Sequence, residues 1–445
     1  MFRSIIAFAM LLVVRPLPSV AETRVWTLEA CIEYAYEHNI ELRRQRLTYE
    51  GKEVSLSEAK WKFFPDISAG TDYSLSAGRV LDETTYDFVE NEVVGGSSLY
   101  VSAGMEIFQG LRKHRELQRA KIDLKASAND LQVSRYELET EVISAFLEVL
   151  CAKESIIEAK RIEEQLRVQE EKTNYKVDLG RSKELDLLQI KAQLYDAAND
   201  VQEAEAEYDI ARLQLCRLIG VDDYNSVEVS ELEPDMGLKP ESRRPVSEIV
   251  DTRPEIKSAE LAVELARKDL QIVKSSLSPV ISLSAGYGTS YSGARKMVLS
   301  DSEGSIRYEP YPFFRQYADN ASSYVSATLS IPIFSGNSTR LAVKQQRIAL
   351  KDAELALDAA RRDMENEVIQ AEINVEAAYR QYLGAQEQSD YAEAVMKNIS
   401  EQYEAGTVDV IAYSTAVAEL IRARYQFLTA KYQYLLKLEI LQLYV

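Results

Sequence analysis

Few residues in this chain could do acid–base, nucleophilic or metal chemistry. The 445 residues include two histidines, His38 and His114, and both fall in helical patterns. That is too little material for a catalytic triad or a histidine-rich metal site. Adjacent carboxylates such as Glu163 and Glu164 could in principle serve hydrolysis, but neighbours on a helix point apart. Since the sequence also has no phosphate-binding glycine loop, we expect no enzyme activity, no metal and no cofactor.

The cysteines and the net charge exclude other classes. Cys31, Cys151 and Cys216 are odd in number and sit in helical patterns, so they are predicted to be buried thiols rather than disulfides or metal ligands. The net charge of −19 argues against nucleic acid as a partner, because such binding needs lysines and arginines on one face. An acidic surface or lumen is the simpler interpretation.

The N-terminus has the pattern of a signal peptide over residues 1–21. Arg3 is followed by an apolar run and by the small-residue sequence Ser19-Val20-Ala21. No later segment approaches the ~18 apolar residues of a membrane helix. We therefore expect an exported chain without a membrane-spanning helix.

Two stretches of the chain repeat each other at an offset of about 226 residues, without insertion. Phe108, Gly110, Gly180 and Leu215, for example, reappear as Phe334, Gly336, Gly406 and Leu441. An insertion within a packed helix turns every later side chain by about 100°, so the preserved register indicates long helices. The predicted organisation is a signal peptide (1–21), a first repeat (22–232), a polar connector (233–245) and a second repeat (246–445).

Each repeat predicts one helix followed by a very long helical hairpin. The predicted helical spans are about 27–64, 111–179 and 182–219 in the first repeat, and about 246–277, 338–405 and 407–443 in the second. At 1.5 Å per residue the longest are roughly 100 Å long. Two shorter helices laid end to end would match one long helix.

Four alternating segments predict strands at one end of the hairpins. Each has apolar residues on one face and small polar residues on the other, near 66–77, 101–107, 281–287 and 325–333. A soluble sandwich would give the same alternation. The signal peptide and the aromatics at the strand edges, such as Trp61, Tyr287 and Tyr324, favour strands of an outer-membrane barrel.

Four strands cannot close a barrel, and a bilayer does not tolerate an open strand edge. Two copies would give eight strands and a filled interior, whereas three would give twelve strands and could leave a lumen. The expected fold is therefore α+β: a membrane β-barrel, four strands per chain and twelve-stranded as a homotrimer, continued by a long α-helical hairpin tunnel.

Several motifs in order resemble the TolC-type outer-membrane efflux proteins over essentially the whole mature length. They are LEACIEYAYEHNIELRRQ, FQG, LGRSKELDLLQIKAQLYDAANDVQEAEAEYDIARLQLCRLIG, DTRPEIKSAELAVELARKDLQIVKSSLSPVISLSAGYG, IPIFSGNSTR and YEAGTVDVIAYSTAVAEL. The resemblance implies an outer-membrane homotrimer with its helices in the periplasm. It also implies docking to a periplasmic adaptor, or membrane fusion protein, and to an inner-membrane pump.

The resemblance also implies roles for residues at the hairpin tips. The family docks its adaptor at the tip turns, which here hold Gly180, Gly406 and Thr407. Better-known members close the tunnel with an aspartate after the first tip and with a tyrosine and an arginine around the second. Asp186 and Tyr403 match two of these, but Val408 stands at the arginine position.

Three charged residues near the tips could form an ion pair in place of the one that Val408 cannot make. Arg181 or Lys183 could pair with Asp409 or Asp186 across the seam between hairpins, although solvated tip charges of less than ~1 kcal/mol each are an equal alternative. A secreted structural coiled-coil protein without a pore is the competing function. It would explain the helices and the signal peptide but not four matched amphipathic strands.

Overall fold

The computed structural model describes residues 24–81, 86–231, 245–300 and 306–444. The predicted signal peptide (1–21) and nearly all of the predicted connector (233–245) lie outside the described residues. The described chain forms two compact units. Unit 1 comprises the described residues up to Leu47, Leu131–Pro254 and those from Arg361 onward, and unit 2 comprises Thr48–Asp130 and Glu255–Ala360.

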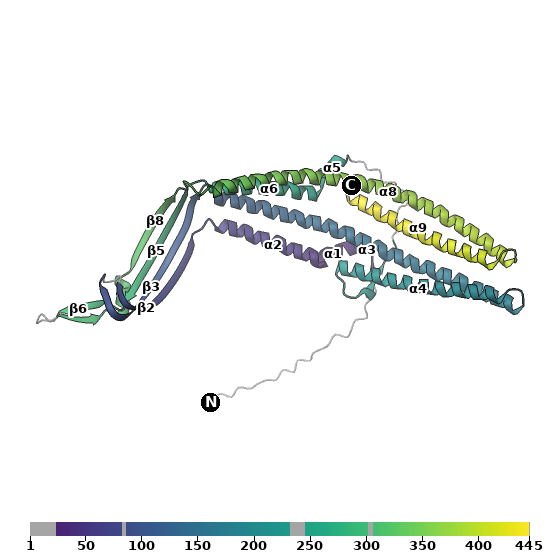
Figure 1. Cartoon of the computed structure of the whole chain (residues 1–445), viewed down its shortest axis with the longest axis horizontal. Coiled ribbons are helices and arrows are strands. Elements are labelled where there is room, and N and C mark those ends of the chain that lie inside the picture. Colours follow the sequence, from purple (N-terminus) through teal and green to yellow (C-terminus); the bar gives the residue numbers. More distant parts are fainter. Residues whose placement is uncertain (1–23, 82–85, 232–244, 301–305, 445) are drawn as a thin grey trace, which may run out of the picture. The chain divides into compact units, whose positions relative to one another are not determined.

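Long helices account for most of the described residues (Figure 1). The helices are α1 (Leu28–His38), α2 (Ile40–Trp61), α3 (Arg112–Asp178), α4 (Glu184–Ile219), α5 (Val246–Thr252), α6 (Pro254–Ser275), α7 (Phe313–Asp319), α8 (Ser338–Glu404) and α9 (Val410–Tyr444), with a short 3-10 helix, η1 (Tyr224–Ser226). The strands are β1 (Arg24–Trp26), β2 (Asp66–Leu81), β3 (Phe88–Gln109), β4 (Val227–Val229), β5 (Val280–Ser292), β6 (Lys296–Ser300), β7 (Ile306–Pro310) and β8 (Ser322–Ser330).

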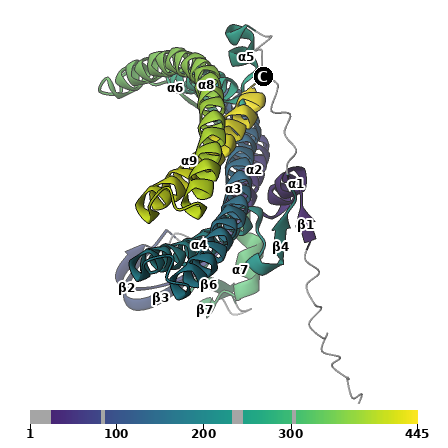
Figure 2. The same cartoon turned by 90° about the vertical axis from the view of Figure 1, so that its right-hand side faces the viewer.

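The long helices agree with the predicted spans. Helices α3 and α8 have 67 residues each, and α4 and α9 have 36 and 35. In unit 1, α4 runs back along α3 and α9 runs back along α8, as both views show (Figures 1 and 2). The order of one helical segment, sheet strands, a long helix and a shorter returning helix occurs in each half of the chain.

Two helices predicted as continuous are each broken once. The span 27–64 is interrupted at Asn39, whose Oδ1 accepts a hydrogen bond from the Leu42 amide at 3.0 Å and caps α2. The Asn39 Nδ2 donates to the Leu218 carbonyl at 2.9 Å, so the break lies where α4 ends. The span 246–277 is interrupted at Arg253, because Pro254 disfavours helical backbone in the preceding residue.

The core of unit 1 joins both hairpins. One cluster contains Val142, Phe146 and Val149 of α3, Leu215 of α4 and Leu435 of α9, all of them fully or almost fully buried. The short parallel pair β1–β4 contributes Trp26, Val227 and Val229 to the same cluster. Apolar burial across α3, α4 and α9 therefore supplies the main attraction that holds unit 1 together.

The four long strands of unit 2 form one antiparallel sheet in the order β2-β3-β5-β8. Residues directly opposite in register share a face, which gives an apolar and a polar face. The apolar face carries Ile67, Ala69, Leu99, Val101, Ala103, Met105, Ile281, Leu283, Ala285, Tyr287, Val325, Ala327 and Leu329. The polar face carries Ser68, Gly70, Asp72, Ser98, Tyr100, Ser102, Ser282, Ser284, Gly286, Tyr324, Ser326 and Thr328.

One detail of the predicted strands is wrong. The fourth strand ends at Ser330 rather than at residue 333, since Pro332 has no N–H to continue the ladder. Tyr100 and Tyr324 lie on the polar face. Their rings lie over Gly70 and Gly286, each directly opposite on the neighbouring strand, and a Cβ at either glycine would come within 2.6 Å of the ring.

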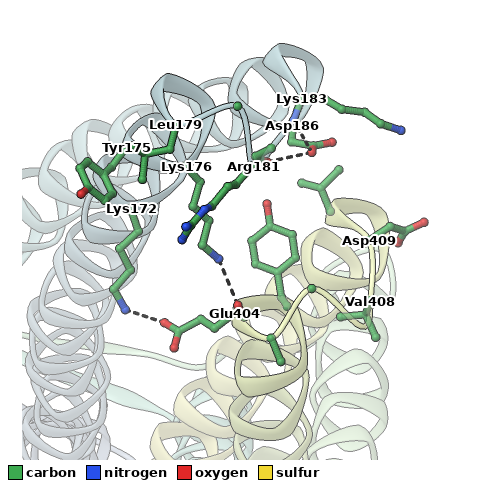
Figure 3. Close-up of a pocket in the computed structure, with 16 residues that line it drawn as sticks. Lys172, Tyr175, Lys176, Leu179, Arg181, Lys183, Asp186, Glu404, Val408 and Asp409 are labelled. Carbon is green, nitrogen blue, oxygen red and sulfur yellow. Dashed lines mark hydrogen bonds and ion pairs between the residues drawn. The ribbon is translucent and has the colours of Figure 1, made fainter.

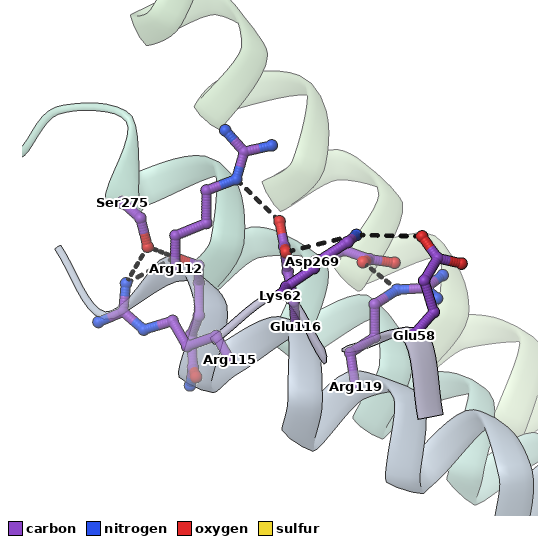
Figure 4. Close-up of polar contacts among 9 residues, drawn as sticks. Glu58, Lys62, Arg112, Arg115, Glu116, Arg119, Asp269 and Ser275 are labelled. Atoms are coloured by element: carbon purple, nitrogen blue, oxygen red, sulfur yellow. Dashed lines mark hydrogen bonds and ion pairs between the residues drawn. The ribbon is translucent and has the colours of Figure 1, made fainter. Parts of the chain in front are cut away.

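Ion pairs connect α2, α3 and α6 in unit 2 (Figure 4). The Arg119 guanidinium contacts the Asp269 carboxylate at 2.5 Å, and Lys62 lies between Glu58 and Glu116 at 3.8 and 3.9 Å. The Arg115 guanidinium donates to Ser275 Oγ and the Gln271 carbonyl at 2.6 and 2.7 Å. These contacts fix the helices at the start of the sheet.

The aromatic segment YEPYPFFRQY, residues 308–317, runs from β7, which pairs with β6, into the helix α7. Among the helices that the structure describes, none is both long enough and apolar enough to cross a membrane.

Candidate functional site at the hairpin tips

The tips of the α3–α4 and α8–α9 hairpins are built in the same way. Gly180 and Gly406 have φ of +68° and +75°, a left-handed conformation that glycine adopts without strain. At the first tip the amides of Gly180 and Arg181 donate to the carbonyls of Val177 and Lys176. At the second, those of Gly406 and Thr407 donate to Tyr403 and Gln402. Both turns are thus Schellman caps that end a long helix.

Tyr403 lines a pocket between the two tips, together with residues of both. Its side chain is buried and its ring packs against Tyr413 at a centroid distance of 5.0 Å. The surrounding apolar cluster includes Ile162 of α3, Ile190 of α4 and Val410 of α9, with Val408 partly buried against it. Val408 therefore places an apolar side chain in this cluster, where the family pattern has a cation.

The predicted acids Asp186 and Asp409 both serve as helix caps within this chain. The Asp186 Oδ2 accepts hydrogen bonds from Ser182 Oγ at 3.0 Å and from the Lys183 amide at 3.2 Å. The Asp409 Oδ1 accepts from the Ala412 amide at 2.9 Å, which caps α9. A carboxylate at the first turn of a helix also interacts favourably with the helix dipole.

The predicted cations have no acidic partner within the described part of the chain. Neither Arg181 nor Lys183 forms an ion pair there, and Lys183 and Asp409 extend away from Glu404 (Figure 3). Both cations are exposed. The structure thus brings together Asp186 and Tyr403 but not the charged pairs with Asp409.

Two lysines of α3, neither of them predicted from the sequence, contact the second tip. Lys172 Nζ lies 2.6 Å from the Glu404 carboxylate, and Lys176 Nζ donates to the Glu404 carbonyl at 3.3 Å. The Lys176 ammonium also lies 5.5 Å from the centre of the Tyr403 ring, a cation–π distance. The spacing of Lys172 and Lys176, one helical turn apart, places both on one face and was the available signal.

Burial and nearby charges shift the pKa values of Tyr403, Tyr413 and Glu404. Burial raises the pKa of Tyr403, and the nearby Asp186 carboxylate raises it further, while hydrogen bonds with Thr173 and Ser182 act in the opposite direction. Burial raises the pKa of Tyr413 to about 12. The hydrogen bond from Lys172 lowers the pKa of Glu404. At neutral pH both tyrosines are therefore neutral and Glu404 is ionised.

The other residues considered as candidates for chemistry, the cysteines and His38, have structural roles. Cys31 and Cys216 are buried free thiols as predicted, and Cys151 is half-buried, with its pKa raised to about 11 mainly by burial. His38 stacks on Tyr34 at 3.8 Å. Within the described ranges, no three or more histidine, cysteine or acidic residues are grouped so that they could hold a metal ion.

Comparison with known proteins shows the family to which the chain belongs. A family model described as outer membrane efflux protein matches residues 31–221 and 246–445. The chain belongs to this outer-membrane efflux protein family. It is 24% identical over 421 residues to the outer membrane protein TolC of Escherichia coli, covering 89% of this chain and 78% of that protein.

Other members of the family are similar in sequence or fold. The alkaline protease secretion protein AprF of Pseudomonas aeruginosa is 26% identical over 311 residues, which are 66% of this chain and 60% of AprF. The Campylobacter jejuni CmeC outer membrane channel aligns with a TM-score of 0.78 at 17% identity, covering 94% of this chain and 85% of CmeC. The open-state MtrE outer membrane channel of Neisseria gonorrhoeae aligns with a TM-score of 0.73 at 17% identity, covering 94% of this chain and 88% of MtrE. These relatives are outer-membrane channel and secretion proteins rather than enzymes, and the protein is an outer-membrane protein.

The Lys172–Glu404 pair predicts a pH-dependent contact between the tips. A carboxyl group whose pKa is lowered on folding stabilises the fold at pH above its ordinary value of 4.5, and this contribution is lost as the pH falls through the lowered pKa. Because both side chains are about half exposed, the pair contributes less than about 1 kcal/mol. Glu404→Gln should therefore speed amide hydrogen exchange at residues 172–186 by up to about fivefold at neutral pH.

At a pH well below the lowered pKa of Glu404 the parent and Glu404→Gln should exchange alike, since the parent carboxylate is then protonated. The exposed Glu401→Gln, three residues earlier in α8, is the matched control and should exchange like the parent at both pH values. Equal exchange of Glu404→Gln and parent at neutral pH would show that this pair does not hold the tips.

Proposed function

We propose that three copies of this chain form the outer-membrane exit duct of a tripartite efflux or type I secretion system. In this proposal the duct is a passive channel that docks to a periplasmic adaptor and an inner-membrane pump. Membership of an outer-membrane family argues against the competing idea of a secreted coiled-coil protein without a pore.

The observation that carries the proposal is the sheet with two open edges. Strand β2 pairs only with β3, and β8 only with β5, among the strands that the structure describes. The apolar face exposes large side chains such as Ile67, Val325 and Leu329, with 71%, 76% and 59% of their surface accessible. A sheet with such a face suits lipid, and in lipid the edges of β2 and β8 need strands of other copies.

Three copies fit the polar face better than two. Serines and glycines dominate that face, and small inward side chains leave room for a lumen in a twelve-stranded barrel. An eight-stranded barrel is filled by its own side chains. The helical hairpins, each roughly 100 Å long at 1.5 Å per residue, would continue this lumen into the periplasm. The two family-matched ranges correspond, in our proposal, to the repeats 22–232 and 246–445.

The partners follow from what the chain lacks and from its relatives. The sequence has no phosphate-binding glycine loop to couple nucleotide hydrolysis to transport, so a separate pump must supply energy. AprF is named as a secretion protein, whereas the family model describes efflux proteins. The transported substrate is therefore proposed only as a solute or protein delivered by the pump.

The first test is the subunit number and the pore. Cross-linking in mild detergent should stop at trimer, and planar bilayers should show pores of low conductance, because the tips narrow the tunnel. The excess of acids, 71 against 52 lysines and arginines, should favour cations, since carboxylates raise the local cation concentration. A ladder that stops at dimer would contradict the proposal, and anion-selective currents would contradict the charge argument alone.

The tip turns are the proposed adaptor contacts, through Gly180, Gly406 and Thr407. No atoms lie within 4 Å of a Cβ placed on either glycine, so a new side chain there would project outward. Gly406→Trp should abolish adaptor cross-linking. Gly406→Asn is the control, because asparagine tolerates the left-handed backbone and adds less bulk. If Gly406→Trp cross-links to the adaptor like the parent, docking does not use this turn.

The same tips are proposed to close the channel. Tyr403 and Asp186 form the centre of the closed arrangement within one chain, while Arg181 or Lys183 would pair with Asp409 or Asp186 of a neighbouring copy. The Lys172–Glu404 contact adds a second link between the hairpins. Opening the tunnel would require the α3–α4 and α8–α9 tips to separate and expose the apolar cluster around Tyr403.

Single-channel conductance tests the closed arrangement. Tyr403→Phe, Asp186→Asn and Arg181→Ala should each raise the conductance and the vancomycin sensitivity of host cells, since losing one such bond costs roughly 1–3 kcal/mol per subunit. Tyr413→Phe is the control and should conduct like the parent. Tyr413 packs against Tyr403 in the same cluster but is not one of the proposed closing residues. If all three variants conduct like the parent while a polar substitution of Val408 opens the pore, closure is apolar.

A further inference from the structure

Helix α7 packs on the apolar face of the sheet. The Tyr317 hydroxyl lies 2.8 Å from Ser97 Oγ, and the Thr289 hydroxyl donates to the Tyr317 carbonyl at 2.6 Å. The Phe313 ring lies 4.8 Å from the Tyr291 ring. Ser97, Thr289 and Tyr291 alternate in register with Leu99, Val101 and Tyr287 and share their face. Helix α7 therefore lies on the side of the sheet that faces lipid in the proposed function, on which this inference rests.

Buried polar contacts hold α7 in this place. Gln316 is 1% exposed, and its amide group accepts from the Ser292 amide and donates to the Ser292 carbonyl, both at 3.0 Å. The Asn320 Nδ2 donates to the Ser290 carbonyl at 2.7 Å. These amides bond to the backbone of β5 beyond Gly288, where β5 still pairs with β3 but no longer with β8. A buried, fully bonded amide fixes orientation, so α7 is part of the rigid sheet.

The position of α7 along the strands places it at one boundary of the apolar band. A tilted membrane strand spans the hydrocarbon with about 9–11 residues. On β5 the apolar face runs from Ile281 to Tyr291, and α7 contacts only the end at Thr289 and Tyr291. The helices attach at the other end, next to Val280. In the proposed orientation α7 thus lies at the outer boundary of the hydrocarbon.

Helix α7 exposes aromatic rings at this boundary. Phe314 is 86% and Phe313 43% exposed, and the two rings meet edge to face at 5.4 Å. Arg315, with 63% of its side chain exposed, lies between Phe314 and the buried Gln316 in the sequence. Aromatic rings beside a charged side chain match the boundary between acyl chains and headgroups.

We propose that α7 is a lipid anchor that inserts Phe313 and Phe314 into the outer leaflet of the outer membrane. The anchor would hold each copy at a fixed depth and add aromatic surface to the barrel's outer girdle. Lipid is the favoured occupant because Phe313 and Tyr317 contact β3 and β5 on the apolar face, the face that meets lipid in the proposed barrel. A neighbouring copy would pair with β2 or β8, at the sheet edges.

Fluorescence quenching in the full-length protein tests the anchor. Phe314→Trp is made with Trp61→Phe, since Trp61 is 65% exposed and would report on its own surroundings, whereas Trp26 is buried. The protein is reconstituted into bilayers whose lipids carry bromine either near the headgroup or near the end of the acyl chain. Phe314→Trp should lose fluorescence with the shallow bromine and little with the deep one, and its emission should shift to the blue.

Two matched variants separate the anchor from the proposed function. Val325→Trp, in the middle of the apolar face, should lose fluorescence with the deep bromine. Phe88→Trp, in the β2–β3 hairpin and 60% exposed, should respond to aqueous acrylamide and to neither lipid.

Quenching of Val325→Trp without quenching of Phe314→Trp would overturn the anchor alone. If acrylamide also fails to reach Phe314→Trp in that case, a protein surface such as a neighbouring copy covers it. If neither variant responds to brominated lipid, the sheet does not enter a bilayer, and the anchor and the proposed barrel both fail.

Discussion

Hydrogen bonding of the strand edges is the constraint on which this architecture depends. A four-stranded sheet in water can leave its edges to solvent, but a sheet in lipid cannot, because an unpaired backbone amide or carbonyl there costs several kcal/mol. In the described sheet β2 and β8 are the outermost strands, and β3 and β5 lie between them. The need to pair β2 with β8 of another copy would set the number of copies, the lumen and the spacing of the helices that continue from each strand.

The same constraint separates two kinds of interaction in the chain. The sheet is held by backbone hydrogen bonds and has little core of its own, since both faces expose most of their side chains. Unit 1 is instead held by apolar burial around Phe146 and Leu215, and the charged tips lie at the ends of its hairpins. A channel of this design can therefore rearrange its tips while the sheet stays fixed, because the two regions rely on different contacts.

Periodicity predicted the long helices and the sheet strands well, because α3, α4, α8 and α9 follow uninterrupted patterns and the first three end at glycines with positive φ. The break at Asn39 could not be foreseen, since its cause is a contact with the Leu218 carbonyl, 179 residues away. Helix α7 was missed for a similar reason: Phe313-Phe314 has no helical period, and Gln316 is fixed by the backbone of β5.

The candidate site was predicted in part. Asp186 and Tyr403 were recognised through the family pattern, and the structure brings them together. Lys172, Lys176 and Glu404 were not, because they meet only when two hairpins more than 200 residues apart lie side by side. The roles of Asp186 and Asp409 as caps were also readable from their positions at the start of α4 and α9.

The two tyrosines that lie over glycines have a consequence for movement along the sheet. Tyr100 covers Gly70 and Tyr324 covers Gly286, so each ring occupies the space where the opposite residue has no side chain. The serines beside these rings are short. In the proposed channel this surface would be smooth and would offer both hydroxyl groups and aromatic faces at similar height. A solute sliding past would exchange one weak contact for another, with low friction and without a deep binding site in which to stall.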